Sequence, residues 1–337
     1  MRVLVVTNMY PTPEKPVFGT FVRTQVECLR RAGIDVDVLA MDGRFRKLIY
    51  PRGIVQLQQR LARERYDLVH AFYGYSGMVA RCQWKLPLVV TYEGSDLNGA
   101  TGWGGRRGRS NAVVVPAGKL LARLADAAIV QSQEMADRIP NANVHVVPHE
   151  VDFDTFQVTP RDEARRQLGL SLDKKYLLFG ANPEIGRKNF ALARAAAAQV
   201  AADDSSVELL VVWRESQPRL ALYMSACDAL VFPSYSEGSP NVVKQALACN
   251  LPIVATDVGD IAEVIAGTDL CFLADFSADE FAARLRQILA TRPRTNGRRQ
   301  AQRYAPEIIV GKVRAIYDDV LSRQSRGLAR AALDRGE

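Results

Sequence analysis

The sequence predicts an α/β protein made of two doubly wound domains and a last helix that crosses back to the first domain. Short Val-, Ile- and Leu-rich runs alternate with segments that carry apolar residues at helical spacing. This alternation is typical of a mostly parallel sheet with helices on both faces. The pattern occurs twice, on either side of a polar, turn-rich segment at residues 148–173. A chain of 337 residues is also too long for one ordinary core and long enough for two domains.

The first set of elements runs from the first residues to about residue 147. Strands are predicted at residues 2–8, 36–41, 67–71, 86–92, 127–130 and 144–147. A helix is predicted at 21–32, where Gly33 is a natural stop, and a second helix at 76–83. We place the first domain at residues 1–152.

The second set begins near residue 175. Strands are predicted at 176–180, 207–212, 229–232 and 252–255, and helices at 190–200, 218–226, 240–249 and 278–289. An apolar stripe at 306–321 predicts the crossover helix, and a basic, Arg-rich tail follows it. We place the second domain at 153–305 and the crossover helix with its tail at 306–337.

Composition narrows the class of protein. No run of 18 apolar residues is present, so no membrane-spanning helix is expected. The start of the chain reads as a buried strand and not as a secretory signal, and the five cysteines are scattered, without metal-ligand spacing. We therefore expect a cytoplasmic protein with reduced, structural thiols. The three histidines form no metal site, and His70 is expected to be packed in the core.

The excess of positive charge lies in the first half of the chain. Residues 1–150 hold 20 Lys/Arg and 13 Asp/Glu, which accounts for the whole net charge of +7. Seven basic residues and one acid lie between Arg44 and Arg65, with Phe45, Leu48, Ile49 and Tyr50 among them. This pattern fits an anionic membrane surface, a phosphorylated acceptor or nucleic acid. A solvated loop whose charge serves solubility explains it equally well.

The stretch FPSYSEGSPNVVKQALACNLPIVAT, residues 232–256, reads as strand, loop, helix and strand. Ser239 suits the N-cap of the helix and Pro240 its first position. The free N–H groups of such a helix suit a phosphate, and Glu237 lies just before them. Asn241 and Gln245 share one helical face, which is either a binding stripe for a ribose or an ordinary polar surface.

This stretch resembles the signature of the family 4 retaining glycosyltransferases, which have the two-domain, Rossmann-like GT-B fold. Glu237 matches the first Glu of the family's motif, which contacts the donor sugar, and Gln245 replaces the second Glu, which bonds the ribose. Gly238, Ser239, Pro240 and Asn241 belong to the same donor-binding segment. Further segments also match in order, namely ADAAIVQSQEMADRI, VHVVPHEVDFDTF and YPTPEKPVFGTFVRTQVECLRRAG, so the resemblance covers nearly the whole chain. In the second of them, His149 and Glu150 stand where the family has Asn and Gly.

The resemblance also implies where the donor diphosphate binds. Gly19 and Thr20 would approach the phosphates at a helix N-terminus. The segment LLFGANPEIGRKNF resembles the loop whose Arg and Lys clamp the diphosphate, so Lys188 is the expected Lys. Asn182 stands where the family's Arg is usual, and Arg187 is expected to substitute for it. Taken by themselves, Arg187 and Lys188 would be an ordinary surface pair, and their position in this segment is what favours the clamp.

The segment VVTYEGSDL departs from the family, which often has His-Gly-Ser-Asp there. Glu93 replaces the His that usually bonds the transferred sugar. We expect Glu93 to bond sugar hydroxyls or to stabilise positive charge on the sugar; the alternative is a carboxylate that caps a loop. Tyr73, Ser95 and Asp96 are placed on the acceptor side. Trp213 or Arg214 is a candidate contact for the base, although core packing is the better-supported role for Trp213. A Gly-rich loop that suits an anionic acceptor, or is simply solvated, contains Trp103, Arg106, Arg107 and Arg109.

The resemblance implies a retaining, metal-independent glycosyltransferase whose two domains face one cleft. The N-terminal domain would bind a carbohydrate, lipid-linked or small-molecule acceptor, and the C-terminal domain a UDP- or GDP-linked sugar as substrate, with no cofactor. Many relatives of this fold act at a cytoplasmic leaflet, which fits a peripheral place on the inner face of the membrane. The alternatives are a nucleotide-sugar epimerase of the same fold, a catalytically idle partner subunit and, least supported, a nucleic-acid-binding protein.

Overall fold

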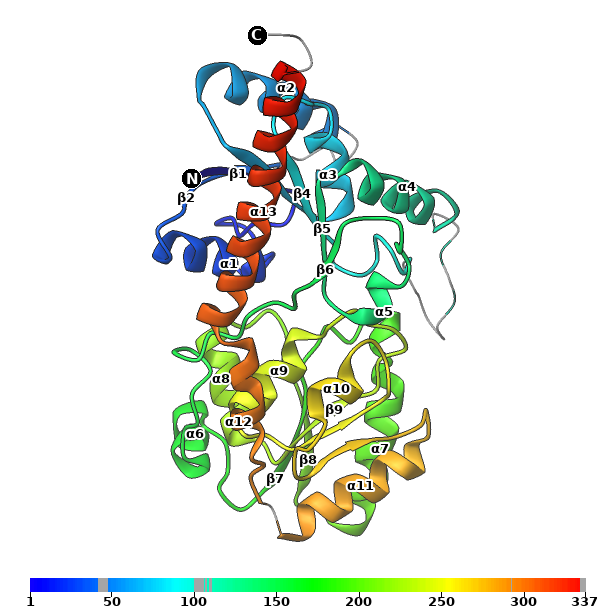
Figure 1. Cartoon of the computed structure of the whole chain (residues 1–337). Helices are drawn as coiled ribbons and strands as arrows, with labels where there is room; N and C mark the ends of the chain where they lie inside the picture. Colours follow the sequence, from blue (N-terminus) through cyan, green and yellow to red (C-terminus); the bar gives the residue numbers. More distant parts are fainter. Residues whose placement is uncertain (42–47, 100–105, 107, 109–110, 292, 334–337) are drawn as a thin grey trace. The chain divides into compact units, whose positions relative to one another are not determined.

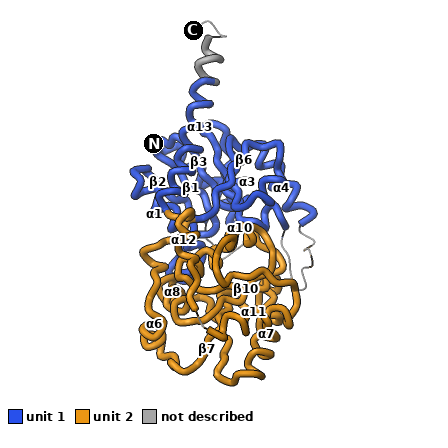
Figure 2. Tube along the Cα trace, turned by 60° about the horizontal axis from the view of Figure 1, so that its bottom comes forward, with its two compact units in different colours: residues 1–99, 109–149, 306–337 blue, residues 100–108, 150–305 orange. Residues whose placement is uncertain are grey.

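The computed structural model of the chain describes all residues except 42–47, 100–105, 107, 109–110, 292 and 334–337, and only the backbone of 327–333. The chain forms two compact units (Figure 2). Unit 1 comprises residues 1–99, 109–149 and 306–337, and unit 2 comprises residues 100–108 and 150–305.

Unit 1 is built on a six-stranded parallel sheet with the order β2-β1-β3-β4-β5-β6 (Figure 1). The strands are β1 (Arg2–Thr7), β2 (Asp35–Ala40), β3 (Leu68–Phe72), β4 (Leu88–Thr91), β5 (Ala127–Val130) and β6 (Val144–Val146). The helices are α1 (Thr20–Arg31), α2 (Ile49–Arg63), α3 (Gly74–Ala80), α4 (Asn111–Leu124) and α5 (Gln133–Ala136). Alternate residues of β1 enter two cores, Val3 and Val5 on one face and Leu4 and Val6 on the other.

Unit 2 repeats this design with a five-stranded parallel sheet in the order β11-β10-β9-β7-β8. The strands are β7 (Lys175–Phe179), β8 (Val207–Val211), β9 (Ala229–Phe232), β10 (Ile253–Ala255) and β11 (Cys271–Leu273). The helices are α6 (Arg161–Leu168), α7 (Phe190–Asp203), α8 (Gln217–Ala226), α9 (Asn241–Ala248), α10 (Ile261–Ile265), α11 (Ala278–Thr291) and α12 (Gly297–Ala301), with 3-10 turns η2 (Gly186–Lys188) and η3 (Gln302–Tyr304). Both faces of this sheet are again buried by helices.

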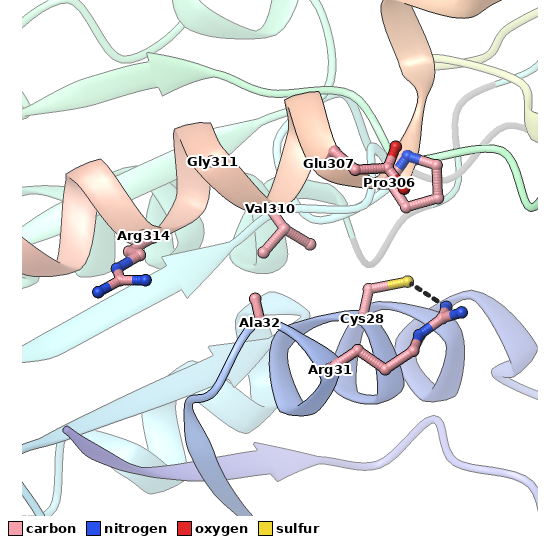
Figure 3. A pocket seen from close by; sticks show the side chains of 8 residues that line it. All are labelled: Cys28, Arg31, Ala32, Pro306, Glu307, Val310, Gly311 and Arg314. Atoms are coloured by element: carbon pink, nitrogen blue, oxygen red, sulfur yellow. Dashed lines mark hydrogen bonds between the residues drawn. The ribbon is translucent and has the colours of Figure 1, made fainter.

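The last helix, α13 (Pro306–Leu333), follows unit 2 in the chain but packs in unit 1. Its stripe of Ile309, Val313 and Ile316 lies in the same core as Val3 and Val5. A cavity of about 370 Å³ lies between α13 and the end of α1, where Arg31 donates a hydrogen bond of 3.0 Å to Cys28 Sγ (Figure 3). The predicted fold class, including the crossover helix, is confirmed.

His70 is packed as predicted. Its Nδ1 lies 2.6 Å from the hydroxyl of Tyr317 on α13, and its Nε2 lies 2.7 Å from Thr91 Oγ1. Burial lowers the pKa of His70 to about 3, so the ring is neutral at pH 7. The side chain therefore ties β3, β4 and α13 together and is not available as a proton carrier.

Several elements of the structure were not predicted from the sequence. The predicted linker at 148–173 contains α6, and the basic run between Arg44 and Arg65 contains α2. The helix α6 is fixed by its tertiary contacts, since the fully buried Arg165 pairs with the buried Asp228 at 3.0 Å. The helix α4 and the strand β11 were also not predicted.

Two surface predictions are changed or left open. Tyr50 was expected to insert into a membrane interface. Instead, its ring stacks on that of Tyr75, with 5.4 Å between the ring centroids, and packs against the core. Leu48 is 61% exposed. Four further members of the proposed surface, Arg44, Phe45, Arg46 and Lys47, lie outside the described residues, as do Trp103, Arg107 and Arg109. In the described part of the chain, no helix has the length and apolar character needed to cross a membrane.

Candidate functional site

The carboxyl ends of β7 and β9 bring together three charged residues of unit 2. Strand order reverses between these neighbouring strands, because β8 lies beside β7 on one side and β9 on the other. Ligands of open α/β sheets bind at such a point. Arg187 and Lys188 lie on the turn η2 after β7, and Glu237 follows β9. The backbone N–H of Tyr235 donates to the carbonyl of Arg187 at 2.8 Å and ties the two loops together.

Arg187 and Lys188 both contact the same oxygen of Glu237. Arg187 Nη1 lies 2.6 Å and Lys188 Nζ 2.7 Å from Glu237 Oε1, and the Glu237 side chain is only 8% exposed. Burial opposes the charge on Glu237, but Lys188 and Arg187 outweigh burial and lower the pKa of this carboxyl. Burial lowers the pKa of Lys188, and the negative charge of Glu237 only partly offsets this decrease. The site thus holds one anion between two cations, and a bound anion would have both cations within reach.

The helix α9 begins one residue later than predicted. Pro240 is its N-cap, with φ −72° and ψ 113°, and makes no side-chain cap bond, so neither the predicted cap of Ser239 nor the helical position of Pro240 is observed. Proline fits here because its fixed φ precedes the first helical turn. Ser239 instead lies beside the buried Asp260. The N–H groups of the first turn of α9 still follow directly after the loop that carries Glu237.

The polar residues predicted for the nucleotide lie on α9 and in the loop after β7. Asn241 opens α9, and its Oδ1 is buried and accepts no hydrogen bond from the described residues. Gln245, one turn later, donates from Nε2 to Gln217 Oε1 on α8 at 3.1 Å. Asn182 accepts the backbone N–H of Glu184 at 3.0 Å, so its amide oxygen shapes the loop after β7.

Gly238 is fixed by a close approach of two loops. Gly259, with φ +62°, faces the carbonyl oxygen of Gly238, and a Cβ at Gly259 would lie 2.3 Å from that oxygen. Only glycine fits this left-handed position at this distance. The loop after β10 therefore presses directly on the loop of Glu237, which the sequence motif alone did not indicate.

In unit 1, the loop after β1 leads to the N-terminus of α1. Gly19 is the N-cap of α1 with φ +71°, and a Cβ there would lie 2.4 Å from the backbone of Met9. Gly19 is thus required for the chain to turn into the helix, as Thr20 begins it. The first N–H groups of α1 lie at the carboxyl edge of the sheet and are those that the family resemblance assigns to the donor phosphates.

Asp96 holds the loop after β4. One of its oxygens accepts the backbone N–H of Gly74 at 3.0 Å, the other that of Gly94 at 3.0 Å, and Glu93 N–H reaches both. Asp96 is 1% exposed. Burial and the charge of Glu93 raise the pKa of Asp96 to about 7. The hydrogen bonds from backbone N–H groups act in the opposite direction but are outweighed. This carboxylate shapes the loop from inside, and the two residues expected beside it on the acceptor side, Tyr73 and Ser95, share a hydrogen bond of 3.3 Å.

Glu93 contacts a residue to which the sequence analysis gave no role. Its Oε2 lies 2.8 Å from His149 Nε2. His149 is 56 positions away in the chain and follows β6. In the sequence, Glu93 and His149 are separate departures from the family pattern, and only Glu93 has an expected role, at the sugar. The presence of two departures whose side chains can hydrogen-bond to one another is the signal that could have indicated this contact.

Trp213 and Arg214 follow β8, and the Arg214 guanidinium stacks on the Trp213 ring at 4.0 Å. No group of three or more His, Cys, Asp or Glu side chains in the described part of the chain is arranged to hold a metal ion.

Comparison with protein families gives two matches that follow one another in the chain. The model described as "Glycosyltransferase Family 4" matches residues 18–155, and the model described as "Glycosyl transferases group 1" matches residues 171–291. The putative teichuronic acid biosynthesis glycosyltransferase TuaC of Bacillus subtilis is 26% identical over 326 residues, which cover 78% of this chain and 83% of that protein. The D-inositol 3-phosphate glycosyltransferase of Geodermatophilus obscurus is 30% identical over 321 residues, which cover 79% of this chain and 69% of that protein.

Solved structures share the fold. Sucrose-phosphate synthase from Thermosynechococcus elongatus superposes with a TM-score of 0.77 at 20% identity, over 96% of this chain and 99% of that chain. Anabaena HepE, solved in complex with UDP-glucose, superposes with a TM-score of 0.69 at 16% identity, over 96% of this chain and 100% of that chain. At these identities the likeness establishes the arrangement of strands and helices.

The buried carboxyl of Asp96 should make stability fall as the pH rises. Folding raises the pKa of Asp96 from 3.8 to about 7, so between these values the folded chain holds a proton that the unfolded chain has released. Relative to the parent, Asp96→Asn should therefore gain about 1 kcal/mol or more of unfolding free energy between pH 4 and pH 7. Urea denaturation at each pH measures this difference. Asp126→Asn, which alters a carboxylate that accepts the Leu88 N–H, is the control. A parallel pH dependence of Asp96→Asn and the parent would contradict the prediction.

Proposed function

Because the chain belongs to the group 1 glycosyltransferases, which use nucleotide sugars, we propose that it is a retaining, metal-independent transferase. It would move a sugar from a UDP- or GDP-linked donor onto a hydroxyl group of an acceptor. The observation that carries the proposal is the contact of Arg187 and Lys188 with Glu237 at the carboxyl ends of β7 and β9.

The two cations suit the leaving group. As the bond between the sugar and the diphosphate breaks, negative charge grows on the phosphate oxygens, and fixed cations in a partly buried site stabilise it. Lys188 is 13% exposed and so largely withdrawn from water, whereas Arg187 is 35% exposed and open to a ligand. In this proposal they supply the positive charge that other transferases take from a metal ion. The N-terminus of α9 would add backbone N–H groups to the phosphates.

The reaction is a simple exchange of bonds. The bond between the anomeric carbon and the phosphate oxygen breaks, and the acceptor oxygen forms a bond to that carbon on the same face. The acceptor's proton passes to the departing phosphate oxygen. We assign no covalent nucleophile. Glu237 would accept hydrogen bonds from the transferred sugar, and Asn241 and Gln245 would face the ribose.

The acceptor class is proposed from the relatives and from charge. TuaC is named for teichuronic acid biosynthesis, and AviGT4, a structural neighbour at a TM-score of 0.62, for avilamycin A biosynthesis. A carbohydrate, a glycolipid or a natural product therefore suits this chain. The basic excess of residues 1–150 supports a cytoplasmic enzyme that binds reversibly to the anionic inner face of a membrane.

The direct test of the reaction is release of a nucleoside diphosphate. The protein is incubated with UDP-glucose, UDP-galactose, UDP-N-acetylglucosamine, UDP-glucuronate and GDP-mannose, with and without EDTA. We expect release from at least one donor, unaffected by EDTA, and a turnover about 100-fold lower in Glu237→Gln, whose shape is kept. Interconversion of donor sugars without release would indicate an epimerase. Release from no donor would indicate an idle subunit, and full activity in Glu237→Gln would remove that residue from the site.

The cation pair should bind the diphosphate itself. We expect Arg187→Gln and Lys188→Gln each to weaken binding of UDP or GDP by about 1.5–3 kcal/mol, the value of hydrogen bonds to charged groups. Glu237→Gln should bind the diphosphate at least as tightly as the parent, because both cations lose their competing partner. Isothermal titration calorimetry measures all three, with circular dichroism to check folding.

Lys175→Gln is the matched control for this measurement. Lys175 lies at the amino end of β7, where it pairs with Asp204 at 2.9 Å, so its loss should leave diphosphate binding unchanged. Unchanged affinity in both cation variants, or an equal loss in Lys175→Gln, would place the diphosphate elsewhere.

Attachment to a membrane is tested with liposomes. We expect the protein to co-sediment with vesicles that contain anionic lipid, and less so as salt is added, because exposed charges are screened. Replacement of Arg44, Arg46 and Lys47 by Ser should reduce binding, since each basic residue near such a surface contributes about 1 kcal/mol. Replacement of the exposed Arg219, Arg286 and Arg299 by Ser removes the same charge from unit 2 as a control. Equal recovery with neutral and anionic vesicles, or no recovery with either, would contradict this proposal.

A further inference from the structure

A buried acid–base pair lies at the carboxyl edge of the unit 1 sheet. Glu93 follows β4, and His149 follows β6, so both side chains come from loops at the edge where ligands of such sheets bind. Glu93 Oε2 and His149 Nε2 are 2.8 Å apart, and the two side chains are 13% and 4% exposed. The pair is thus a shielded hydrogen bond and not a surface contact.

His149 is held from two sides. Its ring lies 4.8 Å from that of Phe21 on α1, at an interplanar angle of 50°. Its backbone N–H donates to Gln131 Oε1 at 3.0 Å, beside the end of β5. The imidazole therefore has a fixed position before any ligand arrives, and it can impose that position on Glu93.

The second oxygen of Glu93 has no partner among the described residues. Glu93 Oε1 is buried and accepts no hydrogen bond there, while Oε2 is taken by His149. The backbone N–H of Glu93 is meanwhile held by Asp96 at 3.1 Å. A buried carboxylate oxygen without a donor is unfavourable, so this oxygen suits a ligand that brings a hydroxyl group.

We propose that His149 is a positioning residue that holds Glu93 so that Glu93 Oε1 accepts a hydrogen bond from a hydroxyl of the transferred sugar. This inference rests on the proposed glycosyl transfer. It assigns a role to His149 and gives a chemical class for the sugar.

The class follows from the charges around the pair. A carboxylate oxygen is only an acceptor, and the carboxyl group of Asp96 lies next to it in the same loop. A neutral sugar offers a hydroxyl to Glu93 Oε1, whereas a sugar acid would bring a second carboxylate to the same place. The site therefore selects a neutral sugar over a uronic acid.

The decisive variants separate the ring of His149 from its hydrogen bond. His149→Phe keeps a ring beside Phe21 and removes the donor to Glu93. His149→Gln keeps an N–H donor at a similar reach and removes the ring. With the best neutral donor of the parent, we expect kcat/KM to fall about 10-fold or more in His149→Phe and to be largely restored in His149→Gln. Glu93→Gln with His149→Phe should be no worse than Glu93→Gln alone, because His149 acts through Glu93.

A spectroscopic arm tests the pair without any turnover. The chain has three histidines, so the ¹⁵N signals of their rings are readily assigned. Glu93→Gln should shift the Nε2 signal of His149 and leave those of His70 and His145 in place. An unmoved His149 signal would overturn the inference, whatever the activity.

Activity then separates this inference from the proposed function. If the parent acts on no donor, the proposed function fails, and the assignment of a sugar to Glu93 fails with it. If the parent is active but His149→Phe retains its kcat/KM, or His149→Gln falls as far as His149→Phe, the positioning role fails alone. In Glu93→Gln, the preference for UDP-glucose over UDP-glucuronate should shrink about 10-fold, and an unchanged preference would contradict the sugar class.

Discussion

The carboxylate of Glu237 lies almost out of water between two cations, and the geometry of unit 2 serves to hold it there. A charge in this position is stable only if opposite charges accompany it, and Arg187 and Lys188 do so at 2.6 and 2.7 Å. Their distances depend on β7 and β9 being neighbours, because each residue lies in the loop directly after one of these strands. The hydrogen bond from Tyr235 N–H to the Arg187 carbonyl keeps the two loops together.

In each unit, a glycine allows a loop at the carboxyl edge of the sheet to lie close to neighbouring backbone. At Gly259 and Gly19 a loop passes so close to neighbouring backbone that a Cβ would lie 2.3 Å and 2.4 Å from it. Both residues also have positive φ. One glycine sets the loop of Glu237 and the other sets the start of α1, so the two sheets each present a tightly fixed loop at their carboxyl edge.

The sequence predicts the fold well because the strands are apolar on both sides, as in parallel sheets. The strand at Ala127–Val130, for example, is predicted to the residue. The sequence predicts helices poorly where tertiary contacts determine whether a helix forms or where it begins. The sequence RDEARRQL of α6 has few apolar residues, and its helix depends on the buried pair of Arg165 and Asp228. The start of α9 is displaced because Pro240 adopts an extended ψ of 113° and serves as the cap itself.

Prediction of the site likewise succeeds where a local motif is enough and fails where tertiary contacts are needed. The motif places Glu237, Arg187 and Lys188 in loops after strands, and strand order alone brings such loops together. The pairing of Glu93 with His149 joins positions 56 apart, and no local pattern shows which side chain of one loop faces that of the other. Asp96 was assigned to the acceptor side, but its oxygens accept bonds from the backbone N–H groups of Gly74, Glu93 and Gly94.

The central claim is that a diphosphate takes the place beside the cations that the carboxylate of Glu237 now occupies. A crystal structure of the protein with bound UDP or GDP tests it most directly. Our account predicts a phosphate oxygen within hydrogen-bonding distance of Lys188 Nζ and of the Arg187 guanidinium, with the Glu237 carboxylate released from at least one of them. A diphosphate bound elsewhere, with both contacts of Glu237 unchanged at 2.6 and 2.7 Å, would contradict it.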